Sequence, residues 1–328
     1  MFKETDDLLI LLLISLLFIS SLFHVHVKPI KFKGFGWYGY LADEEVNENS
    51  LELIKSLGGN AVAISVYYEY DPVTNEFFLL SNMTRVKENI ELAQKRGLSV
   101  LLFPHVNKIG GAYLANEVKK PERYLKKAKQ ISISLARFAE ENNVEMYAVW
   151  NEMGLSLLRV ENSTSLVNEW LQDVLMEVKK VYKGSVITKE GVQLGLYMNY
   201  NYTGFDYLGF TFYPFTNSCY VDPSINKSFC GVNDLKEYEE IVEEALQNIS
   251  YLKKKFGNKG VILAEIGIDV VNGTFVGNDE RSKEIRAKAY EIVLKKGVGI
   301  VDGFFFIKFE REEGGCEKLY TVFRKYFR

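Results

Sequence analysis

The sequence contains few of the residues that serve metal centres and nucleophilic enzymes. Only three of its 328 residues are histidine, and two of these, His24 and His26, lie in an apolar N-terminal segment. This leaves His105 for the folded body. Histidine-rich metal sites need two or three imidazoles, and most serine or cysteine nucleophiles need one as general base. Carboxylate chemistry is therefore favoured, and no metal or cofactor is expected.

Cysteine and net charge are also scarce. Cys219, Cys230 and Cys316 show no C-x-x-C spacing, so zinc ribbons, iron–sulfur ligation and thioredoxin-type chemistry have no support. The 40 basic and 43 acidic residues give a net charge of −3, without the basic surplus typical of nucleic-acid binders. Nucleic acid is therefore not an expected partner.

One long stretch, residues 8–27, carries no charge, and as a helix it would match the ~30 Å apolar core of a bilayer. It lacks the basic leader and the small-residue cleavage site of a signal peptide. We therefore expect residues 1–27 to be an uncleaved membrane anchor and residues 28–328 to be one folded domain. If the segment is cleaved instead, the protein is secreted.

Two features disagree about the side of the membrane on which the body lies. The lysines that follow the apolar segment, Lys28, Lys31 and Lys33, would keep it cytoplasmic. Asn-x-Ser/Thr sequences, of which chance would give about two, favour the outside; they begin at Asn82, Asn162, Asn201, Asn226, Asn248 and Asn272. Cys219 and Cys230 lie in a predicted loop where a disulfide can form. We expect an extracellular, glycosylated body; the alternative is that such residues merely cluster in turns and that the thiols are free.

The body alternates short apolar runs with amphipathic stretches. The runs are Phe32–Tyr38, Ala61–Tyr67, Ser99–His105, Met146–Trp150, Ser185–Lys189, Tyr207–Tyr213, Gly260–Ile266 and Gly303–Lys308, and helices are predicted near 44–57, 84–96, 120–143, 164–182, 234–256, 281–296 and 317–327. Strand-then-helix alternation requires a parallel sheet, and eight such units in about 290 residues predict a (β/α)8 TIM barrel, an α/β fold. A doubly wound sheet is the alternative, because residues 34–39 match G-x-G-x-x-G. That match falls within the first strand, which disfavours a dinucleotide site.

Two carboxylates follow apolar runs directly. Glu152 ends the fourth run and Glu265 ends the seventh. Active sites of (β/α)8 barrels lie at the C-terminal strand ends, where strands four and seven face each other, so the two groups can converge on one bond. Such a pair can provide the acid and base of a glycosidase. Either glutamate alone can equally cap a helix or pair with Lys308.

These residues resemble clan A glycoside hydrolases, the four/seven superfamily. Within the clan, Glu265-Ile266-Gly267 and the segment 206–214 are most similar to glycoside hydrolase family 113, whose characterised members are endo-β-mannanases. The resemblance implies a retaining double displacement, with Glu265 as nucleophile and Glu152 as acid/base. It also implies that Asn151 binds the 2-hydroxyl of the substrate and that Tyr213 orients Glu265.

The chain departs from the clan after the eighth run, where a tryptophan is usual and GFFFIKFE stands instead. Lys308 in this run could contact a charged sugar. Aromatic side chains at strand ends can stack on the apolar faces of sugar rings. The remaining candidates for substrate binding are Trp37, Tyr38, Tyr67, Tyr68 and Trp150, together with His105, which is as easily a structural strand-end histidine.

The sequence thus predicts a membrane-anchored retaining glycosidase that acts on a β-linked polysaccharide or glycan, with β-mannan as the first guess. One alternative is an inactive barrel that binds glycans at the cell surface, which the missing tryptophan favours. Another is an enzyme that uses Lys189 as a Schiff-base amine. Oligomeric state is not predicted.

Overall fold

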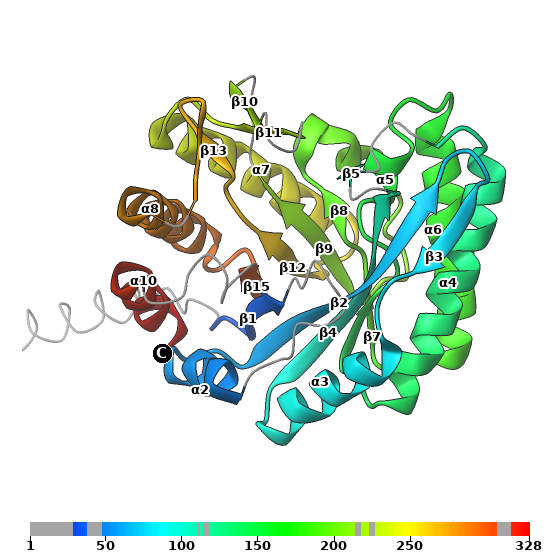
Figure 1. Cartoon of the computed structure of the whole chain (residues 1–328), viewed down its shortest axis with the longest axis horizontal. Helices are drawn as coiled ribbons and strands as arrows, with labels where there is room; N and C mark the ends of the chain where they lie inside the picture. The colour runs from blue at the N-terminus through cyan, green and yellow to red at the C-terminus, as the bar shows by residue number, and fades with distance from the viewer. Residues whose placement is uncertain are drawn as a thin grey trace, which may run out of the picture.

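The computed structural model describes residues 29–37, 48–109, 112–113, 118–213, 218–222, 227–277, 279–306 and 316–328. Eight parallel strands form a closed barrel (Figure 1). In chain order they are β1 (Phe32–Trp37), β2 (Ala61–Asp71), β4 (Ser99–Lys108), β6 (Met146–Ala148), β7 (Ser185–Ile187), β9 (Tyr207–Phe212), β12 (Gly260–Ile266) and β15 (Gly303–Phe306). Each pairs with the next, and β15 pairs with β1. The (β/α)8 prediction is confirmed, and the open doubly wound sheet is excluded.

Helices surround the barrel (Figure 1). They are α2 (Glu48–Ser56), α3 (Met83–Lys95), α4 (Pro121–Glu141), α6 (Ser163–Val181), α7 (Leu235–Lys255), α8 (Glu280–Gly297) and α10 (Glu317–Phe327). Side-chain caps fix several starts: Asn82, Asp234 and Asp279 accept hydrogen bonds from the first N–H groups of α3, α7 and α8. Between β7 and β9 no α-helix forms, and the only helical element is the 3₁₀ helix η1 (Gln193–Asn199), as the short, aromatic sequence predicts.

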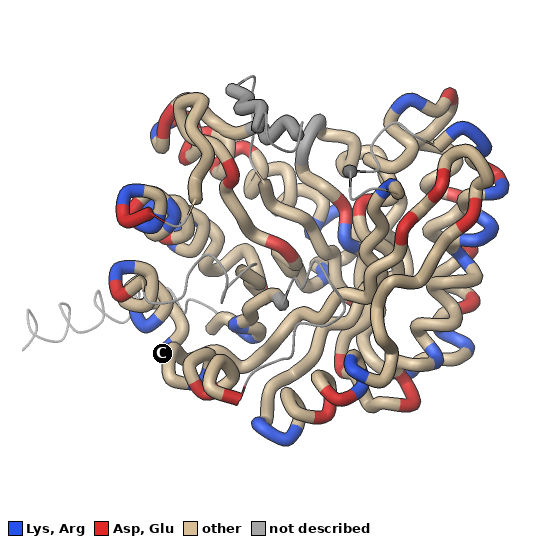
Figure 2. Tube along the Cα trace, viewed as in Figure 1, with Lys and Arg blue, Asp and Glu red and all other residues tan. Residues whose placement is uncertain are grey.

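The core has two layers. Inside the barrel, alanines from β2, β6 and β12 alternate with Phe103 and Phe305, so that small and large side chains fill a narrow interior. A larger cluster lies between the outer strand faces and the helices. Charged residues concentrate on the helices and outer loops, with few along the strands (Figure 2). The few charged groups at the strand ends therefore require an explanation.

Short additional elements follow the barrel strands and form the C-terminal rim. They are β3 (Glu76–Leu79), β5 (Ala112–Tyr113), α5 (Met153–Ser156), β8 (Glu190–Gly191), the hairpin β10 (Ser218–Asp222) with β11 (Lys227–Gly231), and the hairpin β13 (Val270–Val271) with β14 (Thr274–Phe275). The sequence did not predict these elements. A backbone bridge between Val232 and Val271 joins the two hairpins.

Side chains close the N-terminal end of the barrel in a repeated way. A polar residue immediately before the second, fourth, sixth and eighth barrel strands accepts a hydrogen bond from an N–H group near the start of the preceding strand. The bonds are Lys33 N to Asn60 Oδ1 (2.7 Å), Val100 N to Glu145 Oε2 (2.8 Å), Val186 N to Asp206 Oδ2 (2.9 Å) and Val261 N to Asp302 Oδ2 (2.9 Å). Strand ends that would otherwise lack partners are thus satisfied.

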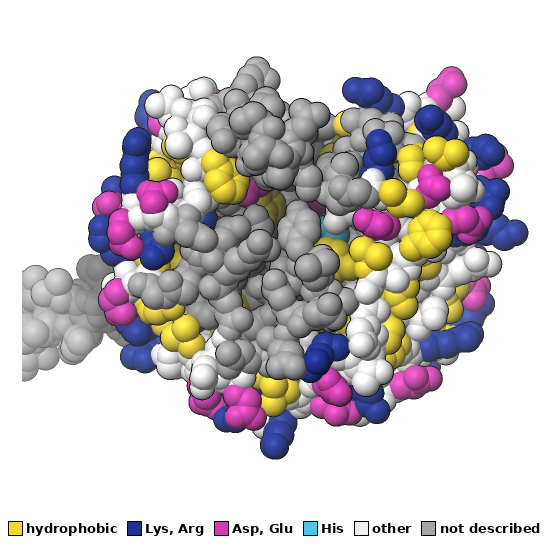
Figure 3. All heavy atoms as spheres, in the orientation of Figure 1, with side chains coloured by type: hydrophobic (Ala, Val, Ile, Leu, Met, Phe, Trp, Pro, Cys, Tyr) yellow, Lys and Arg dark blue, Asp and Glu magenta, His cyan; other side chains and the backbone are white. Residues whose placement is uncertain are grey.

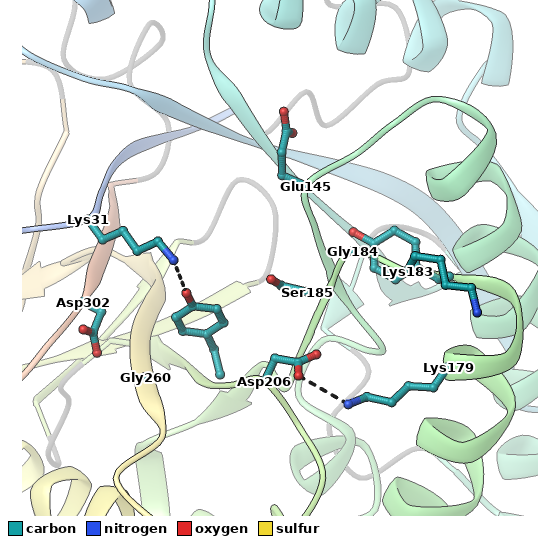
Figure 4. Close-up of a pocket in the computed structure, with 11 residues that line it drawn as sticks. Lys31, Glu145, Lys179, Lys183, Gly184, Ser185, Asp206, Gly260 and Asp302 are labelled. Atoms are coloured by element: carbon teal, nitrogen blue, oxygen red, sulfur yellow. Dashed lines mark hydrogen bonds and ion pairs between the residues drawn. The ribbon is translucent and has the colours of Figure 1, made fainter.

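A hollow of about 800 Å³ lies at this same end (Figure 4). In it Lys31 donates to the Tyr207 hydroxyl (2.6 Å) and Lys179 pairs with Asp206 (3.3 Å). Glu145, Asp206 and Asp302 line the hollow, and all three accept the backbone bonds described above. Because its carboxylates serve the strand ends and it lies opposite the C-terminal rim, we assign this hollow to barrel stability.

Among the described residues, no helix combines the length and the apolar character needed to cross a membrane. The predicted anchor, residues 1–27, lies outside the described residues.

Candidate active site

Glu152 stands at a sharp turn after the fourth barrel strand. Its backbone is left-handed (φ 55°, ψ 50°), a conformation that costs a non-glycine residue about 1–3 kcal/mol. The Glu152 N–H donates to the carbonyl of Lys189 (2.7 Å), which ties the turn to the end of β7. Glu152 as a whole residue is only 6% exposed. The strained turn therefore leads the chain from β6 into α5 and fixes Glu152 at the C-terminal rim.

A β-bulge in β12 determines the direction in which the Glu265 side chain points. Leu263 pairs with Phe210 and Glu265 pairs with Thr211, so Ala264 is an extra residue in β12. Ala264 faces the barrel interior, and strict alternation would turn Glu265 outward. The bulge turns it back instead, and its carboxylate meets the ammonium of Lys189.

Lys189 connects the site across four barrel strands. Its buried ammonium donates to Asn151 Oδ1, to Glu265 Oε2 and to Thr211 Oγ1 (3.2 Å for the last). The Phe103 ring lies beneath it, with 4.6 Å between the Nζ atom and the ring centroid. Three acceptors use all three donors of a charged ammonium. Lys189 therefore holds Glu265 as a carboxylate, and this geometry does not fit the free amine that a Schiff base requires.

His105 supports Asn151 rather than acting as an acid or base. The Asn151 Nδ2 and His105 Nδ1 atoms are 3.3 Å apart. Because the Asn151 oxygen accepts from Lys189, its amide nitrogen must donate here, which leaves the imidazole hydrogen on Nε2. Burial lowers the pKa of His105 to about 4; the Glu265 charge opposes this shift and the Lys189 charge adds to it. The imidazole is therefore neutral near pH 7.

Tyr213 lies beside the strand that carries Glu265. A Cβ atom at Gly267 would come within 2.3 Å of the Tyr213 ring, so only glycine leaves room for this contact. This contact explains the glycine in Glu265-Ile266-Gly267. Two residues after the carboxylate, only a residue without a side chain lets the Tyr213 ring pack there. That Tyr213 orients Glu265 stays a prediction.

Glu190 is a buried acid for which the sequence gave no role. It is 2% exposed, and its Oε2 accepts from the Gly154 N–H (3.1 Å). Burial raises its pKa to about 8; the nearby Glu152 adds to this shift, while the N–H groups of Gly154 and Met153 and the Lys189 charge oppose it. Lys189 and Glu190 stand where an apolar run ends, so the sequence indicates that they lie at a strand end. It does not indicate which groups they contact.

The aromatic residues predicted to bind sugar are buried or half-buried where the structure describes them. The prediction that Trp150 stacks on a sugar is wrong. Trp150 is 1% exposed and packs edge to face with Phe77, Tyr124 and Trp170 in the outer core. Tyr67 contacts the His105 ring, with 4.9 Å between the ring centroids, and is almost fully buried. Tyr68 is half-buried and packs on the outer core. These two placements limit how far Tyr67 and Tyr68 can contact a sugar.

Several predictions lie outside the described residues. Tyr38, Lys308 and the Trp37 side chain are among them, although the Trp37 backbone lies on β1. The backbones of Cys219 and Cys230 lie directly opposite each other in the β10–β11 ladder, but their side chains are not described, so the disulfide stays a prediction. Cys316 is a buried free thiol.

The β2–β3 hairpin adds an apolar surface to the rim that the sequence did not indicate. Apolar side chains gather over β2 and β3 on the face drawn in Figure 3. Phe78, Leu79 and Leu80 each leave nearly half of their surface exposed. In the part of the chain that the structure describes, no group of three or more histidine, cysteine or acidic residues is arranged to hold a metal ion.

The closed barrel carries one carboxylate after its fourth strand and another on its seventh. The profile of Glycoside Hydrolase Family 113 matches residues 31–312, and the chain belongs to this family.

Solved structures share the fold. A family 113 β-1,4-mannanase complex is 18% identical, with 91% of this chain and 98% of that chain covered and a TM-score of 0.64. The family 113 β-mannanase from Alicyclobacillus acidocaldarius, in complex with ManMIm, is 14% identical (91% and 96% covered, TM-score 0.66). A family 5 glycoside hydrolase from Prevotella bryantii is also 14% identical (91% and 96%, TM-score 0.65). No curated protein sequence matches the chain.

Proposed function

We propose that this glycoside hydrolase cleaves β-linked polysaccharides with retention of configuration, and that β-mannan is the first substrate class to test. One observation carries the proposal: Lys189 binds Glu265 through its ammonium and Glu152 through its backbone carbonyl, so the two carboxylate-bearing segments are held at one point of the rim. The family 113 relatives named as β-mannanases support the choice of mannan.

In this mechanism Glu265 attacks the anomeric carbon while Glu152 protonates the leaving oxygen, and the glycosidic C–O bond breaks. Glu152, now ionised, takes a proton from water, whose oxygen displaces Glu265 from the anomeric carbon. Two inversions leave the product with the original configuration. The mechanism needs the two carboxyl groups about 5–5.5 Å apart.

The neighbours of the two glutamates fit these steps. The ammonium of Lys189 keeps Glu265 ionised for the attack and favours its departure as a carboxylate in the second step. Asn151 donates one amide hydrogen to His105, and its side-chain oxygen accepts from Lys189. Its second amide hydrogen is therefore available for the 2-hydroxyl oxygen of the sugar. A bond at that hydroxyl strengthens in the transition state.

The test is hydrolysis by the full-length chain of a panel containing β-mannan, β-glucan, β-galactan and aryl β-glycosides. We expect cleavage of at least one member, with the β-anomer as the first product seen by proton NMR. An α-anomer as first product would overturn retention. Binding of a glycan without turnover would support the alternative of an inactive surface barrel.

We also propose that the enzyme is anchored by residues 8–27 with its body outside the cell. The exposed asparagines Asn82, Asn162, Asn201 and Asn272 begin sequences that can accept glycans, and Cys219 lies opposite Cys230 in the ladder. Mass spectrometry of the protein purified from its source should detect a peptide joined through these cysteines. Two free thiols in that protein would count against an extracellular body.

A further inference from the structure

Consecutive residues after β7 hold both candidate catalytic segments. Lys189 directs its side chain to Glu265, and its carbonyl accepts from the Glu152 N–H. The next residue, Glu190, contacts the turn that carries Glu152, where it accepts from the Gly154 N–H (3.1 Å). The turn is thus held at two adjacent points, one on each side of Met153.

Glu190 and its turn are tightly enclosed. A Cβ atom at Gly154 would lie 2.1 Å from the Tyr200 hydroxyl, so the turn fits closely between Tyr200 and Glu190. These contacts enclose the turn in which the left-handed backbone of Glu152 stands.

From these contacts we propose that Glu190 is a positioning residue for Glu152: a buried carboxyl that accepts from the Gly154 N–H and thereby holds the turn that carries the acid/base. The inference rests on the proposed function, because it assigns Glu152 the role of acid/base. It goes beyond that function by adding a third carboxyl that does not touch the substrate.

The charge state follows from the groups around Glu190. Glu152, Lys189 and three tyrosines, Tyr124, Tyr200 and Tyr202, interact with it electrostatically. Burial raises the pKa of each tyrosine well above its usual value, so these side chains stay neutral. The carboxyl of Glu190, with a pKa of about 8, is therefore protonated below that pH. A charge on Glu190 would lie beside Glu152, so glutamine, which carries no charge, is the variant that matches the protonated acid.

The same raised pKa makes the stability of the protein depend on pH. The carboxyl ionises near pH 4.5 in the unfolded chain but only near pH 8 in the folded protein. Between these values the folded state binds more protons, so this group's contribution to stability is present below about pH 4 and is lost as the pH rises toward 8.

The experiment compares Glu190→Gln with Glu190→Ala, and uses Glu145→Gln at the opposite barrel end as a matched control. Glutamine imitates the protonated acid and keeps an oxygen for the Gly154 N–H. We expect Glu190→Gln to retain kcat within about threefold at pH 6 and to leave the pH profile below pH 8 unchanged, because glutamine carries the same charge as the protonated acid. Glu190→Ala should lower kcat at least about tenfold with KM little changed. Glu145→Gln should leave the pH profile unchanged.

A change of leaving group separates positioning from a purely structural role. An activated aryl β-glycoside needs little protonation, so the loss in Glu190→Ala should shrink on that substrate. A loss of equal size on both substrates, or a fall of more than about threefold in the kcat of Glu190→Gln at pH 6, would overturn the proposal. If Glu190→Ala does not fold, the kcat of Glu190→Gln at pH 6 decides.

Failure of the glycosidase function can be distinguished from failure of the role proposed for Glu190. A wild-type chain that hydrolyses nothing overturns both the glycosidase function and the role of Glu190 in it. In that case thermal unfolding of wild type and Glu190→Gln still reports the charge of the buried carboxyl. A difference between their unfolding midpoints that grows from pH 5 to pH 8 shows an uncharged Glu190, and a constant difference shows the opposite.

Discussion

Replacing Glu265 with alanine is expected to lower kcat by more than about a thousandfold on every substrate that the enzyme cleaves, because the reaction then has no nucleophile at the anomeric carbon. The loss should be the same for good and poor leaving groups. Added azide can enter the space of the missing carboxylate and attack the sugar once, so the product should be the α-glycosyl azide. Kinetics with and without azide, followed by NMR of the product, check this.

Glu152→Ala is the matched variant for the acid/base position. It should lose a similar factor on polysaccharide but much less on an activated aryl glycoside, whose leaving group needs no proton. Azide should then attack the glycosyl-enzyme and give the β-glycosyl azide, because two inversions occur. If both variants gave the same azide anomer, the assignment of nucleophile and acid/base would be wrong.

Lys189→Met is expected to lower kcat about a hundredfold. Methionine fills similar volume without charge, so Glu265 loses its buried cationic partner and the Asn151 oxygen loses a donor. A carboxylate without that partner holds its proton to higher pH. The acidic limb of the kcat profile should therefore move to higher pH.

The control for this prediction is Lys31→Met, which removes a lysine that binds Tyr207 at the opposite end of the barrel. It should leave kcat and its pH profile unchanged. If Lys189→Met kept the wild-type acidic limb, the ammonium would not be what holds Glu265 ionised. Circular dichroism of both variants separates a catalytic effect from unfolding.

The strands, the main helices and the two glutamates could be predicted because each follows from local sequence. An apolar run followed by a polar residue marks a strand end, and helical spacing marks the crossovers. Glu152 and Glu265 stood out because each directly follows such a run. Closure of the barrel then brings them to the same rim.

The means by which those glutamates are aimed could not be predicted from local sequence. The bulge at Ala264 depends on pairing with β9, more than 50 residues earlier in the chain, and the ion pair of Lys189 with Glu265 joins positions 76 apart. The placement of Trp150 could not be predicted from local sequence either. Val149 and Trp150 both belong to the outer core, so the inward–outward alternation of side chains ends after Ala148. The tryptophan that was expected at the sugar therefore lies beneath the helices.

The repeated bonds at the N-terminal end of the barrel also divide the molecule into modules. Each bond joins two neighbouring strands, and its partners are 27, 45, 20 and 41 positions apart in the chain. All four therefore lie within successive quarters of the chain, each made of two strand–helix units. A cut between Lys183 and Gly184, just before β7, would leave two of these bonds intact in each half. Each half would thus keep the bonds that close the base of its own strands, and the two would depend on each other for the rim, where Lys189 joins Asn151 in one half to Glu265 in the other.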